Sequence, residues 1–137
     1  MFTLNRTKFS AWSLFLIAAL ALGSIPSSVP ALAEPTLVQT INTGAGSSWG
    51  PTYSPDPSGI TYWATNGTLV IVDGEVEEMS IWAGANVFES TLQGSLLRTH
   101  DISAWNNEPV GIDIDINPAN DHFFIANDSV KIIYEID

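Results

Sequence analysis

A short motif that occurs twice constrains this chain of 137 residues more than any other feature. The run Asp56-Pro57-Ser58-Gly59-Ile60 returns 52 positions later as Glu108-Pro109-Val110-Gly111-Ile112, so both copies read acidic-Pro-x-Gly-Ile. After each copy come a strand-like run, a polar turn and a second apolar run. The same parts in the same order, offset by 52 residues at the motif and by 54 at the second strand, indicate a repeat in which each copy is one supersecondary unit.

The residues of each copy predict strands. Leu69–Val72 and Phe123–Ala126 are rich in β-branched and aromatic residues, and polar turns precede them at 64–68 and 117–122. No helical period occurs after residue 33, so the predicted fold class is all-β, with about four short antiparallel strands per unit. The other strand candidates are 79–82, 86–92, 96–100, 130–137 and the alternating run 112–116.

A period of about 50 residues with four antiparallel strands matches one blade of a β-propeller. Propellers close with 4–8 blades, so two copies predict an incomplete ring. The predicted organisation is an entry segment at 34–57, a first blade at 58–107 and the start of a second blade at 108–137. A complete small β-sandwich with a similar number of strands is the alternative.

Residues 1–33 have the pattern of a secretory signal peptide. Arg6 and Lys8 form a basic start, residues 11–22 are almost entirely apolar, and Ala31-Leu32-Ala33 is a small-x-small cleavage site. We therefore expect cleavage before Glu34 and a secreted or periplasmic product. A membrane anchor is the alternative, but glycine and prolines interrupt the apolar stretch before it reaches the roughly 20 residues that a bilayer requires.

The charge and the absence of cysteine exclude several classes of function. After residue 33 only Arg98 and Lys131 stand against fifteen acidic residues, a formal charge of −13. So few cations argue against nucleic acid and, once the signal is removed, against an anionic membrane as partner. Without cysteine the chain has no disulfide framework, no thiol nucleophile and no thiolate metal site.

The order of carboxylates around the predicted hairpins suggests a calcium site. In an antiparallel hairpin, the start of the first strand and the end of the second lie at the same edge. Stacked units would bring both sets of oxygen ligands together, as Ca²⁺ requires. The alternative is that turns simply favour these residues. The candidate metal ligands are Asp56, Asp73 and Glu75 in the first copy, and Glu108, Asn127 and Asp128 in the second.

Other motif matches lack the context that they need. Gly46-Ser47-Ser48-Trp49-Gly50 fits G-x-S-x-G, but Pro51 and Pro55 forbid the helix that follows a nucleophile elbow. The run 113–117 opens like a calcium loop, yet Pro118 and Phe124 replace its required Gly and Glu, so we expect a strand with exposed acids. We expect the two histidines to be surface residues, and the tryptophans of the mature chain to fill cores.

Four stretches together resemble the blades of secreted bacterial phytase-like and NHL-type six-bladed propellers, over roughly residues 49–137. The stretches are Asp56-Pro57-Ser58-Gly59-Ile60-Thr61-Tyr62, Leu69-Val70-Ile71-Val72-Asp73-Gly74-Glu75, Asn107-Glu108-Pro109-Val110-Gly111-Ile112 and the run 125–137. The resemblance implies a calcium-dependent propeller with carboxylates at the channel mouth. In phytase-like members, calcium would bind a phosphomonoester and activate water.

The expected function is therefore that of an exported acidic propeller fragment of a calcium-dependent phosphomonoester hydrolase, with a phosphorylated small molecule as partner. The chain departs from the phytase pattern because it lacks the Lys and Arg side chains that help to hold phosphate. The alternatives are a non-catalytic secreted binding module and an inactive truncated gene product. Unpaired strand edges predict self-association in either case.

Overall fold

A computed structural model describes residues 34–76, 80–117 and 119–137. The predicted signal peptide lies outside these residues. All strands of the described residues lie within one compact unit, 37–137. No helix occurs in the part of the chain that the structure describes, and hence none there that could span a membrane. The all-β prediction is confirmed.

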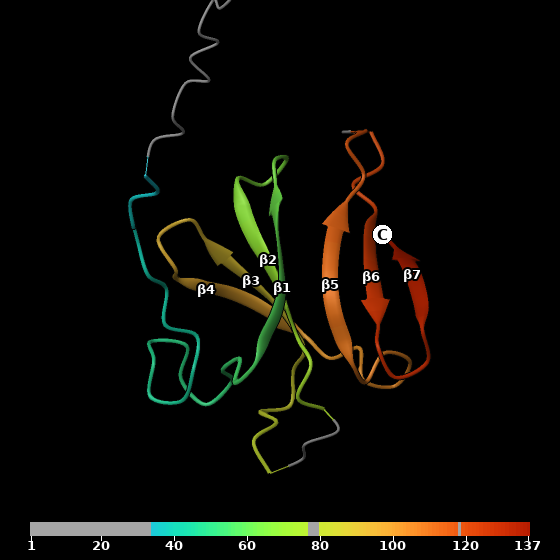
Figure 1. Cartoon of the computed structure of the whole chain (residues 1–137), viewed down its shortest axis with the longest axis horizontal. Helices are drawn as coiled ribbons and strands as arrows, with labels where there is room; N and C mark the ends of the chain where they lie inside the picture. The colour runs from blue at the N-terminus through green and yellow to red at the C-terminus, as the bar shows by residue number, and fades with distance from the viewer. Residues whose placement is uncertain (1–33, 77–79, 118) are drawn as a thin grey trace, which may run out of the picture. The chain divides into compact units, whose positions relative to one another are not determined.

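In the described part of the chain, seven antiparallel strands form two sheets (Figure 1). In the four-stranded sheet each strand pairs with the next along the chain, as in a meander: β1 (Pro57–Trp63), β2 (Thr68–Asp73), β3 (Val87–Thr91) and β4 (Leu96–His100). The three-stranded sheet has the same order: β5 (Pro109–Ile114), β6 (Phe123–Asn127) and β7 (Ile132–Ile136). Residues 80–82 form no strand, and the alternating run stops at Ile114 rather than Ile116.

The sequence repeat is also a structural repeat. In each sheet the motif proline pairs with the last residue of the next strand, and a register shift follows directly. The residue after that strand then donates its N–H to the carbonyl of the motif's acidic residue. These bonds run from Gly74 to Asp56 (3.4 Å) and from Asp128 to Glu108 (3.0 Å). Both copies of acidic-Pro-x-Gly-Ile therefore start their sheets in the same way.

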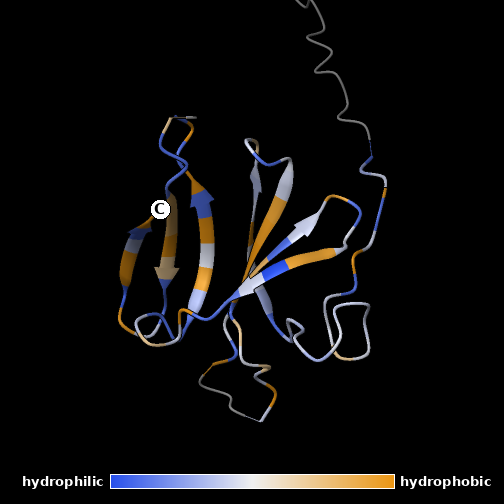
Figure 2. Cartoon of the chain, turned by 180° about the vertical axis from the view of Figure 1, so that it is seen from behind, coloured by the Kyte–Doolittle hydropathy of each residue, from blue (hydrophilic) through white to orange (hydrophobic). Residues whose placement is uncertain are grey.

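The two sheets stack with different faces in contact. The face of the first sheet that carries Val70 and Val72, and the equivalent face of the second sheet, are called the front, and the opposite faces the back. Val70 and Val72 of β2 share an apolar cluster with Phe123 and Ile125 of β6, so these four residues face one another. Because β6 follows β2 by 54 positions in the repeat, the residue equivalent to Val70 is Phe124, which lies on the opposite face. The front of one repeat thus packs on the back of the next. Figure 2 shows the apolar stretches of β2, β6 and β7.

The backs of β2 and β3 are covered by the segment that precedes β1, residues 37–56. Trp49 is buried there with Ile71 and Phe88, and its ring stacks on that of Phe88 at 5.5 Å. Its indole N–H donates to the carbonyl of Gly94 (2.9 Å). The run 46–50, which matched the nucleophile motif, forms turns here and no helix follows it.

The first strands of the two repeats, β1 and β5, approach each other at the level of the backbone. A Cβ atom on Gly59 would lie 2.8 Å from Gly111 Cα and 3.0 Å from Ile112 N. Only a residue without a side chain fits there. Figure 1 shows β1 and β5 as neighbours, with β4 and β7 at the far sides of their sheets. The glycine of the first motif copy, Gly59, is therefore required where the two repeats meet.

Candidate functional site

The two motif copies meet at one sheet edge, around Gly74. A methyl group on Gly74 would lie 3.6 Å from the Pro109 carbonyl oxygen, 3.8 Å from Glu108 Oε1 and 3.9 Å from Asp56 Oδ2. The Ser58 hydroxyl also donates to the Pro109 carbonyl, which ties the two repeats together at this point. Three oxygens from both repeats thus converge on a buried glycine, and two of them belong to predicted metal ligands.

Asp73 has a structural environment. It is fully buried, and its Oδ2 accepts hydrogen bonds from the Ser54 hydroxyl and from the Asp56 N–H (2.9 Å). Its Oδ1 accepts the N–H of Glu75 (3.0 Å). Three protein donors balance the cost of burying this charge. The carboxylate fixes both the entry into β1 and the turn after β2.

Asn127, the equivalent residue of the second repeat, is held by an amide network. Its Nδ2 donates to Asn106 Oδ1 (2.6 Å), and its Oδ1 accepts the N–H of Val130 (3.0 Å). Asn86 extends the network, because its Nδ2 donates to the Asn106 carbonyl (2.9 Å) and its Oδ1 accepts the Ile102 N–H (2.8 Å). All three asparagines are buried. The network joins the four-stranded sheet to the second repeat.

Sequence reasoning missed Ser54, Asn86 and Asn106. A signal for two of them was present in the repeat, because Asn106 follows Ser54 by 52 positions, the same spacing as the motif. In both repeats this position bonds to the residue that ends the second strand. Asn86 has no such equivalent that would mark it.

The six predicted metal ligands occupy different surroundings, and Glu75 is half-buried directly after β2, where its N–H donates to Asp73 Oδ1 (3.0 Å). Asp56 and Glu108 converge at Gly74, whereas Asp73 and Asn127 are engaged by protein donors as above. Asp128 is exposed and forms an ion pair with Lys131 (2.6 Å). Among the described residues no group of three or more His, Asp or Glu is arranged to hold a metal. The calcium role of the six stays a prediction, and Asp56 and Glu108 are the pair whose placement suits it best.

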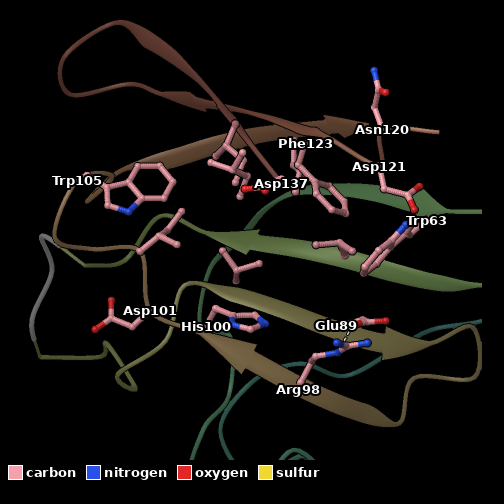
Figure 3. Close-up of a pocket in the computed structure, with 16 residues that line it drawn as sticks. Trp63, Glu89, Arg98, His100, Asp101, Trp105, Asn120, Asp121, Phe123 and Asp137 are labelled. Carbon is pink, nitrogen blue, oxygen red and sulfur yellow. Dashed lines mark ion pairs between the residues drawn. The ribbon is translucent and has the colours of Figure 1, made fainter. Parts of the chain in front are cut away.

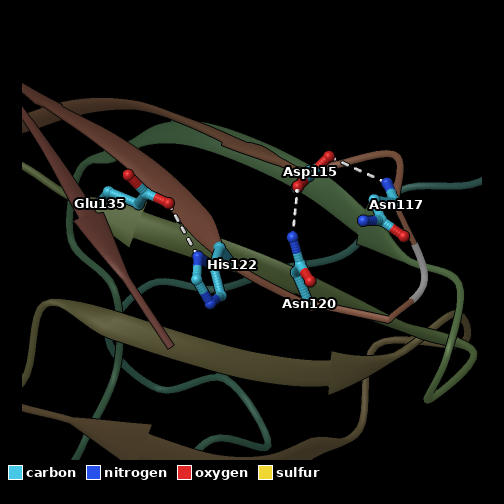
Figure 4. Close-up of polar contacts among 5 residues, drawn as sticks. All are labelled: Asp115, Asn117, Asn120, His122 and Glu135. Carbon is cyan, nitrogen blue, oxygen red and sulfur yellow. Dashed lines mark hydrogen bonds and ion pairs between the residues drawn. The ribbon is translucent and has the colours of Figure 1, made fainter.

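The turn between β5 and β6 is held by polar contacts of its own (Figure 4). Asp115 accepts the N–H of Asn117 (2.9 Å) and the side-chain amide of Asn120 (3.3 Å). His122 Nδ1 lies 2.7 Å from Glu135 Oε1, and this hydrogen bond raises the pKa of His122 above its ordinary value of 6.5. The run 113–117, which opens like a calcium loop, thus ends β5 and continues into a segment where Asp115 is engaged by protein donors.

Comparisons with protein-family models, curated proteins and solved structures found no match to this chain. The propeller resemblance therefore rests on the residues quoted for it.

Proposed function

We propose that the two sheets are successive blades of an exported β-propeller that binds calcium where its repeat motifs meet. One observation carries the calcium proposal: carboxylate oxygens of Asp56 and Glu108 and the Pro109 carbonyl surround Gly74. Ca²⁺ takes 6–8 oxygen ligands in a flexible arrangement, and carboxylates with a backbone carbonyl are typical members of such a set. The missing Cβ leaves space among these oxygens.

The front-to-back packing supports the propeller part of the proposal. Such packing uses two different faces, so it can continue from one repeat to the next. The front face of the second repeat carries Phe124 and Ile133, which are 38% and 70% exposed. The equivalent face of the first repeat is buried under the second. A further blade would cover this apolar surface in the same way.

Binding is favoured over catalysis because few side chains of this protein could hold a phosphate group. Arg98 pairs with Glu89 and Lys131 pairs with Asp128, and these are the only Lys or Arg after residue 33. A phosphomonoester would depend on the metal alone. The phosphomonoester hydrolase rests on the resemblance, and release of p-nitrophenol from p-nitrophenyl phosphate with calcium present would support it.

The substitution Gly74→Ala tests the calcium site. The added methyl would make ordinary van der Waals contacts of 3.6–3.9 Å, and Gly74 has no positive φ, so the fold should be retained. The methyl would nevertheless occupy the space between the oxygens. We expect calorimetric titration to show calcium binding to the parent chain. The variant should bind calcium at least about tenfold more weakly, because the methyl disturbs the arrangement of the ligand oxygens.

The matched control is Gly44→Ala, which adds the same methyl at another glycine with ordinary φ, 3.6 Å from Asn42 Oδ1. It should bind calcium like the parent chain. Magnesium, which demands a near-ideal octahedron, should bind less tightly than calcium. Equal calcium affinity in the parent and Gly74→Ala chains would overturn the site.

Export is tested separately by mass spectrometry of the secreted product. The predicted N-terminus is Glu34, because the small-x-small site ends at Ala33. An intact Met1 in the membrane fraction would contradict the prediction.

A further inference from the structure

A cavity of about 480 Å³ lies between the two sheets, away from the Gly74 edge (Figure 3). Its apolar lining includes Val70, Val87, Ile112, Phe123 and Ile125, residues that belong to the inter-sheet cluster or pack against it. Cavities of 300–1,000 Å³ with an apolar lining and a few polar groups are typical of small-molecule sites. The size and lining suit a compact ligand with an apolar body.

The charge around this cavity is strongly negative. One cation, Arg98, lines it, and its guanidinium already pairs with Glu89. Asp121 accepts the Thr65 hydroxyl (2.7 Å) and Asp101 accepts the Ser103 N–H (2.9 Å), and both donors are neutral. The polar lining consists of Glu89, Arg98, His100, Asp101, Asn120, Asp121 and Asp137.

Two indole rings stand at opposite ends of the cavity in Figure 3, those of Trp63 and Trp105. Trp63 packs edge-on against Phe123 at 5.1 Å and Trp105 against Tyr134 at 4.8 Å, so both rings are held in place. Arg98 lies 6.0 Å from the centre of the Trp63 ring, within the range of a cation–π contact. Aromatic faces beside carboxylates are the chemistry that recognises organic cations.

We propose that this cavity binds a small organic cation with an apolar body, of the arylalkylammonium class. The apolar body would occupy the lining of valine, isoleucine and phenylalanine side chains. The ammonium would lie at the end of the cavity where Figure 3 shows Asp121 beside Trp63, and the negative charge there favours it over a neutral or anionic molecule of the same shape. This site shares no residue with the Gly74 edge.

The test compares three probes of similar shape and different charge: 2-phenylethylamine, 2-phenylethanol and 3-phenylpropanoate. Each is titrated into the full chain with a chelator present, so that calcium plays no part, and binding is followed by calorimetry and by tryptophan fluorescence. We expect the amine to bind about tenfold more tightly than the alcohol. The propanoate should bind more weakly than either. Equal affinities, or tighter binding of the alcohol or propanoate, would overturn the proposal.

Charge-removing variants locate the site. Asp121 has a φ of +49°, a conformation that asparagine adopts readily, so Asp121→Asn should fold and keep its bond to Thr65. Asp101→Asn retains the acceptor for Ser103. We expect Asp121→Asn to weaken amine binding about threefold without changing alcohol binding, whereas Asp101→Asn, at the other end of the cavity in Figure 3, should leave amine binding unchanged.

The control is Asp113→Asn, an exposed acid of β5 that does not line the cavity. It removes the same charge and should leave amine binding unchanged. If Asp113→Asn weakens the amine as much as Asp121→Asn does, the attraction is a property of the whole acidic surface and the cavity site is wrong. Gly74→Ala should leave amine binding intact, which separates this site from the calcium site.

Discussion

Gly59 and Gly111 occupy the same position in the two repeats, yet the structure predicts opposite effects when each becomes alanine. At Gly59 the new Cβ would meet Gly111 Cα at 2.8 Å, Ile112 N at 3.0 Å and Val72 Cγ2 at 3.0 Å. Two of these neighbours are backbone atoms that cannot rotate away. At Gly111 the new Cβ would have nothing within 4 Å. Neither glycine has a positive φ, so alanine is not strained by its backbone at either site.

The magnitudes follow from these contacts. Overpacking a core by one carbon costs about 1–3 kcal/mol, and backbone neighbours place Gly59→Ala near the upper end. Gly111→Ala should stabilise by about 0.4–1 kcal/mol, because alanine restricts the unfolded chain more than glycine does. For a domain of this size 1 kcal/mol corresponds to about 4–8 °C in Tm. The two variants should therefore differ by at least about 10 °C.

Thermal melts followed by far-ultraviolet circular dichroism, with urea titrations to obtain the free energy of unfolding, measure both changes. The Gly111→Ala chain is the matched control, because it carries the same substitution on the equivalent strand. If both variants lose the same stability, or if Gly59→Ala melts like the parent, the close approach of β1 and β5 is incorrect.

Three further predictions concern the amide network, a histidine and the front face. Asn127→Ala should destabilise by about 1–3 kcal/mol in urea titration, because it leaves buried polar partners unpaired; unchanged stability would refute the network's role. The raised pKa of His122 means that its pair with Glu135 stabilises the fold below about pH 6.5 and that this contribution disappears as the pH rises through the folded pKa. NMR titration should show the raised pKa in the parent and a lower one in Glu135→Gln, and identical values would exclude the pair. Finally, Phe124→Ser should reduce self-association in analytical ultracentrifugation by removing apolar surface; the Lys131→Ser chain, altered in the exposed turn between β6 and β7, should associate like the parent.

Local chemistry explains why much of the fold could be predicted from the sequence. The strands at 68–73 and 123–127 are β-branched or aromatic runs bounded by polar turns, and that preference needs no distant partner. Residues 81 and 82 are equally apolar but form no strand. Whether an apolar pair joins a sheet depends on a neighbouring strand with free hydrogen-bonding groups, which a local pattern does not reveal.

The candidate site was harder to predict from the sequence, because it depends on contacts between residues that are far apart along the chain. The spacing placed Asp56 and Glu108 at one edge, since both precede the first strand of their repeat. It could not show that Asp73 is turned inward to accept three hydrogen bonds, because that requires Ser54 and the entry into β1. The cavity was equally hidden. The walls of the cavity belong to both sheets. Its volume depends on the distance between the sheets away from their close contact at Gly59.

The segment 37–56 has a consequence for how copies of this chain can assemble. Front-to-back contacts between separate molecules are heterologous and can grow without limit into filaments. Here the back of the first sheet is already occupied by the chain's own residues, among them Trp49. A second molecule could add to that side only by displacing them. Contact between two front faces avoids this cost and closes after one step, so we expect any association of copies to favour two-fold dimers over fibres.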